Sequence, residues 1–143
     1  MADLRAIFDD LVRFETVMWG EIDARLRLEC AVSLSNVNVM MVIDSTPDCR
    51  VYDIARALAI TVGGASQAVD RLEAAGGCVR RANPADRRSS LVELSNEGNA
   101  LLAKALVVFD DELDRLIRVP LSAPALLHLA GALHTVRQSA TPA

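Results

Sequence analysis

The sequence predicts a mainly α-helical protein with one small β-hairpin near the middle of the chain. Hydrophobic residues make up 52% of the 143 residues and aromatic residues only 3%, so Ala, Leu and Val must fill the core. Ala and Leu are strong helix formers. Apolar residues recur at helical spacing toward both ends of the chain. Between them, residues 78–81 and 89–94 have the pattern of two short strands joined by a polar loop.

The first 45 residues are expected to form two helices. Residues 3–28 carry an apolar stripe wider than one packing face requires, which predicts burial by the parent domain and by a second subunit. The second helix is expected over about 35–45, with Ser35 as its N-cap. The sequence Thr46-Pro47-Asp48 should end it.

The middle of the chain predicts two more helices before the hairpin. Residues 51–59 have the pattern of a short helix, and a turn at Ile60-Thr61 leads into another helix that ends near Ala75. Gly76 suits the left-handed position after that helix. One face of the second helix is apolar, and the other is small or polar.

Capping residues delimit the helices that follow the hairpin. Ser95 is the expected N-cap of a helix that continues to about Arg118, and Pro120 stops it. A last helix is expected from Ser122 onward. The length of the chain suits one domain with its own core, and residues 1–143 are expected to form it.

Charge is distributed unevenly along the chain. The net charge is -4, but residues 50–94 sum to +2 and the remaining residues to -6. A basic segment inside an acidic frame is typical of a local surface for a polyanion such as nucleic acid.

Several classes of protein are disfavoured. No apolar run reaches the roughly 18 residues of a membrane span, and the acidic N-terminus differs from a signal peptide, so a cytoplasmic location without a membrane partner is expected. No phosphate loop, metal-ligand spacing or nucleophile–base pairing stands out, which indicates neither an enzyme nor a metal site.

The three cysteines, Cys30, Cys49 and Cys78, are widely spaced and form no CxxC motif. Buried thiols are the expected interpretation. A redox-sensing thiol is the alternative, and it would require an exposed cysteine with a lowered pKa.

The helix pair at residues 51–75 has the arrangement that enters a DNA major groove. On its second helix, Ser66 and Gln67 can hydrogen-bond base edges, and Arg71 can reach a base or a phosphate. Asp70 on the same face would repel phosphate unless an arginine neutralises it.

The hairpin adds further arginines. Arg80 and Arg81 at its base are expected to contact phosphates. Asp86 is expected to pair with the guanidinium of Arg88 and hold it extended for the minor groove. The alternative is a surface ion pair without a functional role.

Four motifs together resemble the MarR family of winged-helix transcriptional regulators. They are Leu72-Glu73-Ala74-Ala75-Gly76, Arg80-Arg81, Pro84-Ala85-Asp86-Arg87-Arg88 and Leu94-Ser95-Asn96-Glu97-Gly98. The preceding residues 53–60 fit the first helix of the family's helix-turn-helix. Gly77 and Gly63-Gly64 differ from the family pattern, which has bulkier residues there.

The resemblance implies a winged helix-turn-helix flanked by N- and C-terminal dimerisation helices. Residues 35–98 would be the DNA-binding lobe, and residues 1–34 and 99–143 the dimerisation helices. The protein would then be a homodimeric, ligand-responsive repressor that binds a pseudo-palindromic operator in double-stranded DNA. The residues expected to contact DNA are Thr61, Ser66, Gln67, Arg71, Arg80, Arg81, Asp86, Arg87 and Arg88, with Arg88 as the wing arginine and Asp86 as its orienting acid.

The resemblance also implies a small aromatic or anionic effector, and no cofactor. Such a ligand would bind between the dimerisation helices and the winged helix, near Trp19, Met40 and Met41, although plain core packing is the alternative for each. A second interpretation of the whole chain is a winged-helix dimer that acts through protein–protein contacts, and a third is the thiol-based redox regulator.

Overall fold

The computed structural model describes residues 1–141, and the chain divides into two compact units, residues 1–108 and the residues from Phe109 onward. The first unit contains α1 (Leu4–Cys30), α2 (Leu34–Ser45), α3 (Val51–Leu58), α4 (Val62–Ala74), β1 (Cys78–Ala82), β2 (Ser90–Leu94) and the start of α5 (Asn96–Leu113). The second contains the end of α5, a π-helical turn (Asp114–Arg118) and α6 (Ala123–Ala140). This element order confirms the predicted fold class.

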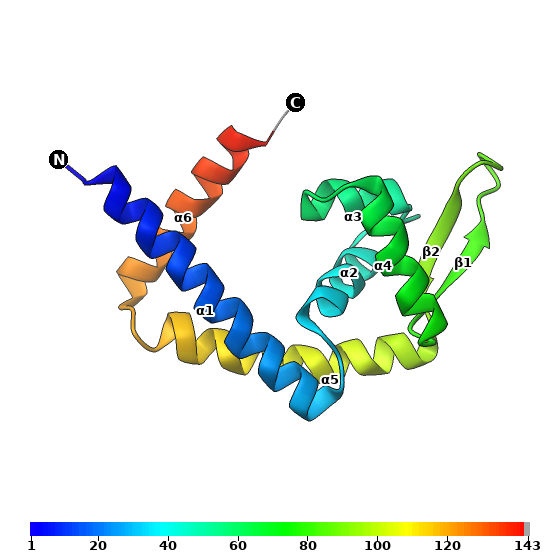
Figure 1. Cartoon of the computed structure of the whole chain (residues 1–143), viewed down its shortest axis with the longest axis horizontal. Coiled ribbons are helices and arrows are strands. Elements are labelled where there is room, and N and C mark those ends of the chain that lie inside the picture. The colour runs from blue at the N-terminus through cyan, green and yellow to red at the C-terminus, as the bar shows by residue number, and fades with distance from the viewer. Residues whose placement is uncertain (142–143) are drawn as a thin grey trace. The chain divides into compact units, whose positions relative to one another are not determined.

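The hairpin is the only sheet within residues 1–141 (Figure 1). Its two strands are antiparallel, with a register that runs from Cys78 opposite Leu94 to Ala82 opposite Ser90. The N–H group of Val92 donates to the carbonyl oxygen of Cys49 at 2.7 Å, so β2 is also bonded to the segment that leads into α3. The hairpin is thereby anchored to the helices at its base.

The core of the first unit lies between α1, α2, α3, α4 and the hairpin. Each element contributes side chains that alternate with solvent-facing ones at the period of its secondary structure. The largest fully buried side chains are Leu26, Met40, Ile54, Val37, Val69, Val92, Cys49 and Cys78. Burial of each large apolar side chain contributes about 1.5–3 kcal/mol relative to exposure, so this core fixes the helix pair and the hairpin together.

The predicted N-cap of α2 was wrong, because the N-cap lies two residues earlier than expected. Its N-cap is Ser33, whose hydroxyl accepts the N–H of Asn36 at 3.1 Å, and Ser35 lies exposed in the first turn. The N–H of Leu34 donates to the carboxylate of Asp23 on α1 at 2.8 Å. That hydrogen bond, together with Arg27, lowers the pKa of Asp23. A contact between two helices therefore fixes where α2 starts.

The first helix ends at Cys30, two residues later than expected, whereas the starts of α4, α5 and α6 agree with the prediction. The Thr61 hydroxyl accepts the N–H of Gly64 at 3.0 Å, and the Ser95 hydroxyl accepts the N–H of Gly98 at 2.9 Å. Ser122 caps α6 in the same way. Gly76 has φ of +83°, the left-handed conformation expected after α4. These caps satisfy first-turn N–H groups that have no partner inside their helices.

Most side chains of α1 are exposed. Only Ile22, Leu26 and Cys30 of this helix are buried. The exposed large apolar residues of α1 are Leu4, Ile7, Phe8, Leu11, Val12, Phe14, Val17, Trp19 and Leu28. An apolar stripe of this size marks an interaction surface. Its predicted burial by a second subunit stays a prediction.

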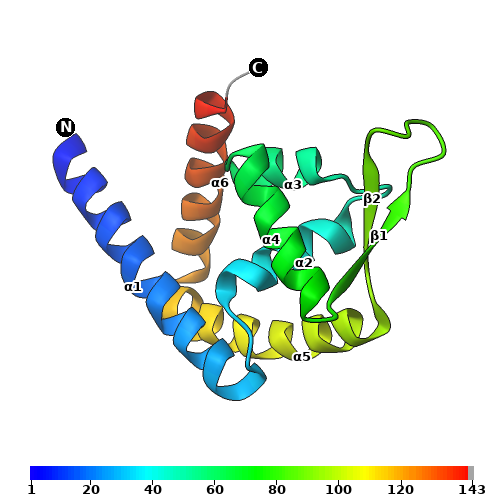
Figure 2. The same cartoon turned by 45° about the vertical axis from the view of Figure 1, so that its right-hand side comes forward.

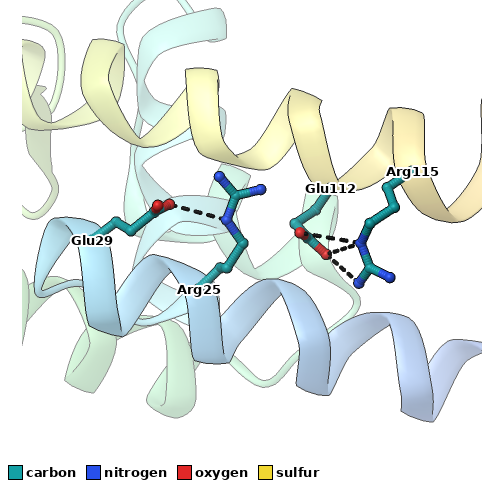
Figure 3. A network of polar contacts seen from close by, with 4 residues as sticks. All are labelled: Arg25, Glu29, Glu112 and Arg115. Carbon is teal, nitrogen blue, oxygen red and sulfur yellow. Dashed lines mark hydrogen bonds and ion pairs between the residues drawn. The ribbon is translucent and has the colours of Figure 1, made fainter.

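Ion pairs between neighbouring turns run along the long helices (Figure 3). In the first unit, the Arg25 guanidinium lies 3.0 Å from the Glu29 carboxylate. In the second unit, the carboxylate of Glu112 is buried and lies 2.7 Å from the guanidinium of Arg115.

No single helix within residues 1–141 is long and apolar enough to cross a membrane. Two pairs of helices reach that length and composition together, and each pair is sharply bent at its break.

Candidate nucleic-acid interface

The α3–turn–α4 segment presents one face of α4 to solvent. The apolar face of α4, with Ala65, Ala68, Val69 and Leu72, is buried against its neighbours. Because residues repeat every 3.6 positions, the opposite face is left outside. α3 packs against α4, and its Ile54 and Ala55 are buried. A second helix held in this way is the helix that enters a DNA major groove in helix-turn-helix proteins.

The predicted readout residues lie on that outer face. Gln67 and Arg71 are exposed, and Ser66 is half-buried. Arg71 has no ion-pair partner within residues 1–141. Thr61 is exposed and caps the first turn, which places its side chain at the start of the helix. A side chain at Gly63 would meet nothing within 4 Å, so the first turn offers a bare backbone surface.

The loop between β1 and β2 is folded by its own side chains. The Asn83 side chain accepts the N–H of Ala85 at 3.0 Å and donates to the hydroxyl of Ser89 at 3.1 Å. Such Asn and Asp side chains replace main-chain partners in tight turns. The loop extends beyond α3 and α4 in both views (Figures 1 and 2). Arg87 and Arg88 are exposed in it, which makes the hairpin a wing with two cationic side chains near its end.

The expected pairing between Asp86 and the Arg88 guanidinium is wrong. The Asp86 carboxylate instead accepts the main-chain N–H of Arg88 at 2.9 Å. Two residues apart in a tight turn, the carboxylate lies beside the next free amide, whereas the guanidinium is at the far end of a long side chain. Within the described residues the Arg88 guanidinium has no ion-pair partner. Asp86 therefore shapes the main chain that carries Arg88.

Arg80 and Arg81 both have carboxylate partners inside the chain. The Arg80 guanidinium lies 2.6 Å from Asp70 and 2.9 Å from Glu73, both on α4. Arg81 lies 2.6 Å from Glu93 across the hairpin. The arginine that neutralises Asp70 is therefore Arg80. Contacts of Arg80 and Arg81 with phosphate stay predictions.

The structure adds two residues that sequence reasoning did not select. Arg56 on α3 is exposed and has no ion-pair partner within residues 1–141. Val62, the first residue of α4, is 54% exposed despite its apolar side chain. A signal in the sequence could have placed Arg56 on the outer face. It lies three residues after Asp53, away from the inward-facing Ile54 and Ala55.

The three residues selected for an effector lie in unlike surroundings. Met40 is fully buried, Met41 is half-buried and Trp19 is 40% exposed. Two surface hollows of the first unit are lined by other residues. The larger, about 580 Å³, is bordered by residues 46–48, Arg50, Asp53, residues 83–85 and Leu91. The assignment of an effector to Trp19, Met40 and Met41 stays a prediction.

The thiols are inaccessible. Cys30, Cys49 and Cys78 are all buried and unpaired. Burial raises the pKa of Cys49 to about 11, and Asp53 adds to that shift; burial likewise raises the pKa of Cys78 to about 11, with a contribution from Glu73. Within residues 1–141, no group of three His, Cys, Asp or Glu side chains is placed to hold a metal ion.

These features define a winged helix-turn-helix: an α3–turn–α4 unit, an exposed polar face on α4 and an arginine-bearing hairpin. Residues 32–90 match the model of the MarR family. A search of curated protein sequences gave no match.

Solved structures share the fold over nearly the whole chain. Sco3205, a MarR family transcriptional regulator from Streptomyces coelicolor solved in complex with DNA, is 20% identical with a TM-score of 0.91, covering 100% of this chain and 94% of that one. AbsC from the same organism, also a MarR family transcriptional regulator, is 16% identical with a TM-score of 0.87, covering 97% and 95%. CouR from Rhodococcus jostii RHA1, bound to p-coumaroyl-CoA, is 20% identical with a TM-score of 0.79, covering 88% and 87%.

Proposed function

We propose that this protein is a transcriptional regulator, and not an enzyme, that binds double-stranded DNA as a homodimer. The observation that carries the proposal is the pairing of an exposed polar face on α4 with a wing whose loop arginines, Arg87 and Arg88, have no ion-pair partner within residues 1–141. Arg56, Arg71, Arg87 and Arg88 are exposed and have no ion-pair partner within residues 1–141. Uncompensated arginines on one lobe of an acidic protein supply the counterion release that drives DNA binding.

Family resemblance supports the same target. Sco3205, which shares the fold, was solved with DNA. On this chain, α4 would enter the major groove with Gln67, Ser66 and Arg71 near base edges, and Arg88 would enter the minor groove from the wing. Val62 at the start of α4 suits contact with a thymine methyl group.

The exposed stripe on α1 supports the homodimer. Nine large apolar side chains are open to solvent there in the single chain, including Phe8 and Leu11. A two-fold dimer would place two α4 helices against two half-sites, so the operator should be pseudo-palindromic. Repression follows if that operator overlaps a promoter.

The test is selection of DNA from a random duplex pool by the full-length protein, followed by affinity measurement at several salt concentrations. We expect an enriched sequence with two-fold symmetry and binding that weakens steeply with salt. A pool without enrichment, or binding indifferent to salt, would contradict the proposal. Specific capture of a protein by the α4 face in that case would favour the protein–protein alternative.

An effector is the finer part of the proposal. CouR, with the same fold, was solved with an aromatic acyl-CoA. Trp19 is the only tryptophan of the chain, so its fluorescence reports on ligands near α1. The protein is titrated with aromatic carboxylates and their CoA thioesters. A compound that is an effector should change this fluorescence and release bound DNA. Since all three thiols are buried, an oxidant is not the signal we propose.

A further inference from the structure

The side chain of Arg80, on β1, is held between two carboxylates of α4. Its two terminal nitrogens lie 2.6 Å from Asp70 and 2.9 Å from Glu73. Its side chain is 24% exposed, against 65% for that of neighbouring Arg81, which pairs only with Glu93. Arg80 is therefore fixed between strand and helix, whereas Arg81 lies open on the hairpin.

Glu73 holds the main chain of β1 as well. Its second carboxylate oxygen accepts the N–H of Arg80 at 3.1 Å. Arg80 is opposite Val92 in the sheet, and the N–H of Val92 points away from β1, toward Cys49. In such a pair both N–H groups face outward, so the N–H of Arg80 lies at a strand edge that no further strand covers. One carboxylate of α4 thus fastens both the main chain and the side chain of β1.

The charges of Arg80, Asp70 and Glu73 bear on how this lobe would bind DNA. Asp70 and Glu73 place two negative charges on the helix proposed to face DNA, where they would repel phosphate. The positive charge of Arg80 is engaged in offsetting them. Exposed ion pairs on their own add little to the stability of a protein. The network of Arg80, Asp70 and Glu73 must therefore be explained by its burial and its geometry.

We infer that Arg80 is a positioning residue: through Asp70 and Glu73 it fixes the wing against α4, and it does not contact phosphate. The inference rests on the proposed DNA-binding function. It has an unusual consequence, because removal of a negative charge from the DNA-facing lobe should then weaken binding to DNA.

The test compares Glu73→Ala with Glu93→Ala in the full-length protein. Both remove one carboxylate, but Glu93 pairs with open Arg81 and does not join the hairpin to α4. Affinity is measured by fluorescence anisotropy for a duplex selected with the wild-type protein. Glu73→Ala should weaken binding by about tenfold, the scale of a lost specific contact, while Glu93→Ala leaves it unchanged or tighter. If Glu73→Ala instead tightens binding, the inference is overturned.

A second measurement separates positioning from simple loss of stability. If Arg80 acts by placing the wing, Arg88→Gln should cost much less in an Arg80→Gln background than in the wild type. Independent contacts would give additive losses, and so would a general loss of folded protein. Additive losses, or a salt slope lowered by about 0.9 per subunit in Arg80→Gln, would assign Arg80 to phosphate and refute the inference.

Two controls exclude loss of folding or of dimerisation as the cause of weaker binding. Thermal midpoint and dimer mass are measured for each variant, and Glu73→Gln, which keeps an acceptor oxygen, replaces Glu73→Ala if the latter does not fold. A wild-type protein that selects no duplex overturns the proposed function and this inference with it. A wild type that binds, with Glu73 variants that bind equally well, overturns the inference alone.

Discussion

The carbonyl oxygen of Gly77 lies so close to the Cα atom of Gly98 that a Cβ on Gly98 would overlap it. The same carbonyl accepts the N–H of Ser95 at 3.1 Å. The start of the hairpin and the first turn of α5 are thus in direct main-chain contact. Gly77 is itself confined, because a Cβ there would lie 2.6 Å from Leu72 Cδ1. Gly77, which differs from the family pattern, therefore lies at a tightly packed position.

Gly98→Ala should destabilise the protein. The atom that its Cβ would meet belongs to the main chain, which cannot rotate aside, so the hairpin or α5 must shift. Overpacking of this kind typically costs about 1–3 kcal/mol of unfolding free energy, which urea denaturation measures. Gly63→Ala is the matched control, since nothing lies within 4 Å of its Cβ. Alanine there should be neutral or stabilise by up to about 1 kcal/mol; equal losses in both variants would contradict the proposed contact.

Stability should fall in alkaline solution as the buried thiols ionise. The pKa of Cys49 and that of Cys78 are each raised from 9.0 to about 11 in the folded protein. The folded state therefore holds protons that the unfolded state has lost, and its stability declines as pH rises from about 9 to 11. The chain has one lysine and one tyrosine, so few other groups titrate there. Urea denaturation at pH 8, 9.5 and 11 measures the decline.

Cys49→Ala and Cys78→Ala provide the control for that experiment. Each should lower stability at pH 8 through lost packing and flatten its dependence on pH. Rapid alkylation of the native protein at pH 8 would show that the thiols are reachable, and the explanation from burial would then fail.

The sequence predicted what is local and missed what depends on packing. Ser95 and Gly76 were assigned correctly as capping residues because a cap depends on a few neighbouring residues. Ser33 was missed in favour of Ser35, since the start of α2 is set by a hydrogen bond to Asp23, eleven residues earlier.

The candidate site shows the same division. Exposure of Gln67 and Arg71 follows from helical period alone and was predicted. The partners of Arg80 could not be predicted, because Asp70 and Glu73 approach it only when the hairpin folds back onto α4. For Asp86, the pairing with Arg88 was expected between side chains, but the turn geometry that favours the main-chain amide was not visible in the sequence.

Phe8→Asp should convert the proposed dimer into a monomer. Phe8 is 68% exposed on α1, inside the apolar stripe. A carboxylate buried in a subunit interface without a partner is costly, so association should be lost at micromolar concentration. Sedimentation equilibrium measures the mass, and Asp10→Ala, at an exposed polar position of the same helix, is the control. A monomeric wild type, or a Phe8→Asp variant that stays dimeric, would exclude this stripe as the interface.

Arg88→Ala and Asp86→Ala should both weaken DNA binding, for different reasons. Loss of the Arg88 guanidinium removes a proposed minor-groove contact, worth about 1–3 kcal/mol, and lowers the salt slope by about 0.9 per subunit. Loss of the Asp86 carboxylate frees the N–H of Arg88 and loosens the turn that carries it. Removal of a negative charge alone would strengthen binding to DNA. Weaker binding by Asp86→Ala, with an unchanged dependence of affinity on salt, would therefore identify Asp86 as a residue that shapes the wing. Tighter binding would indicate that Asp86 acts only through its charge.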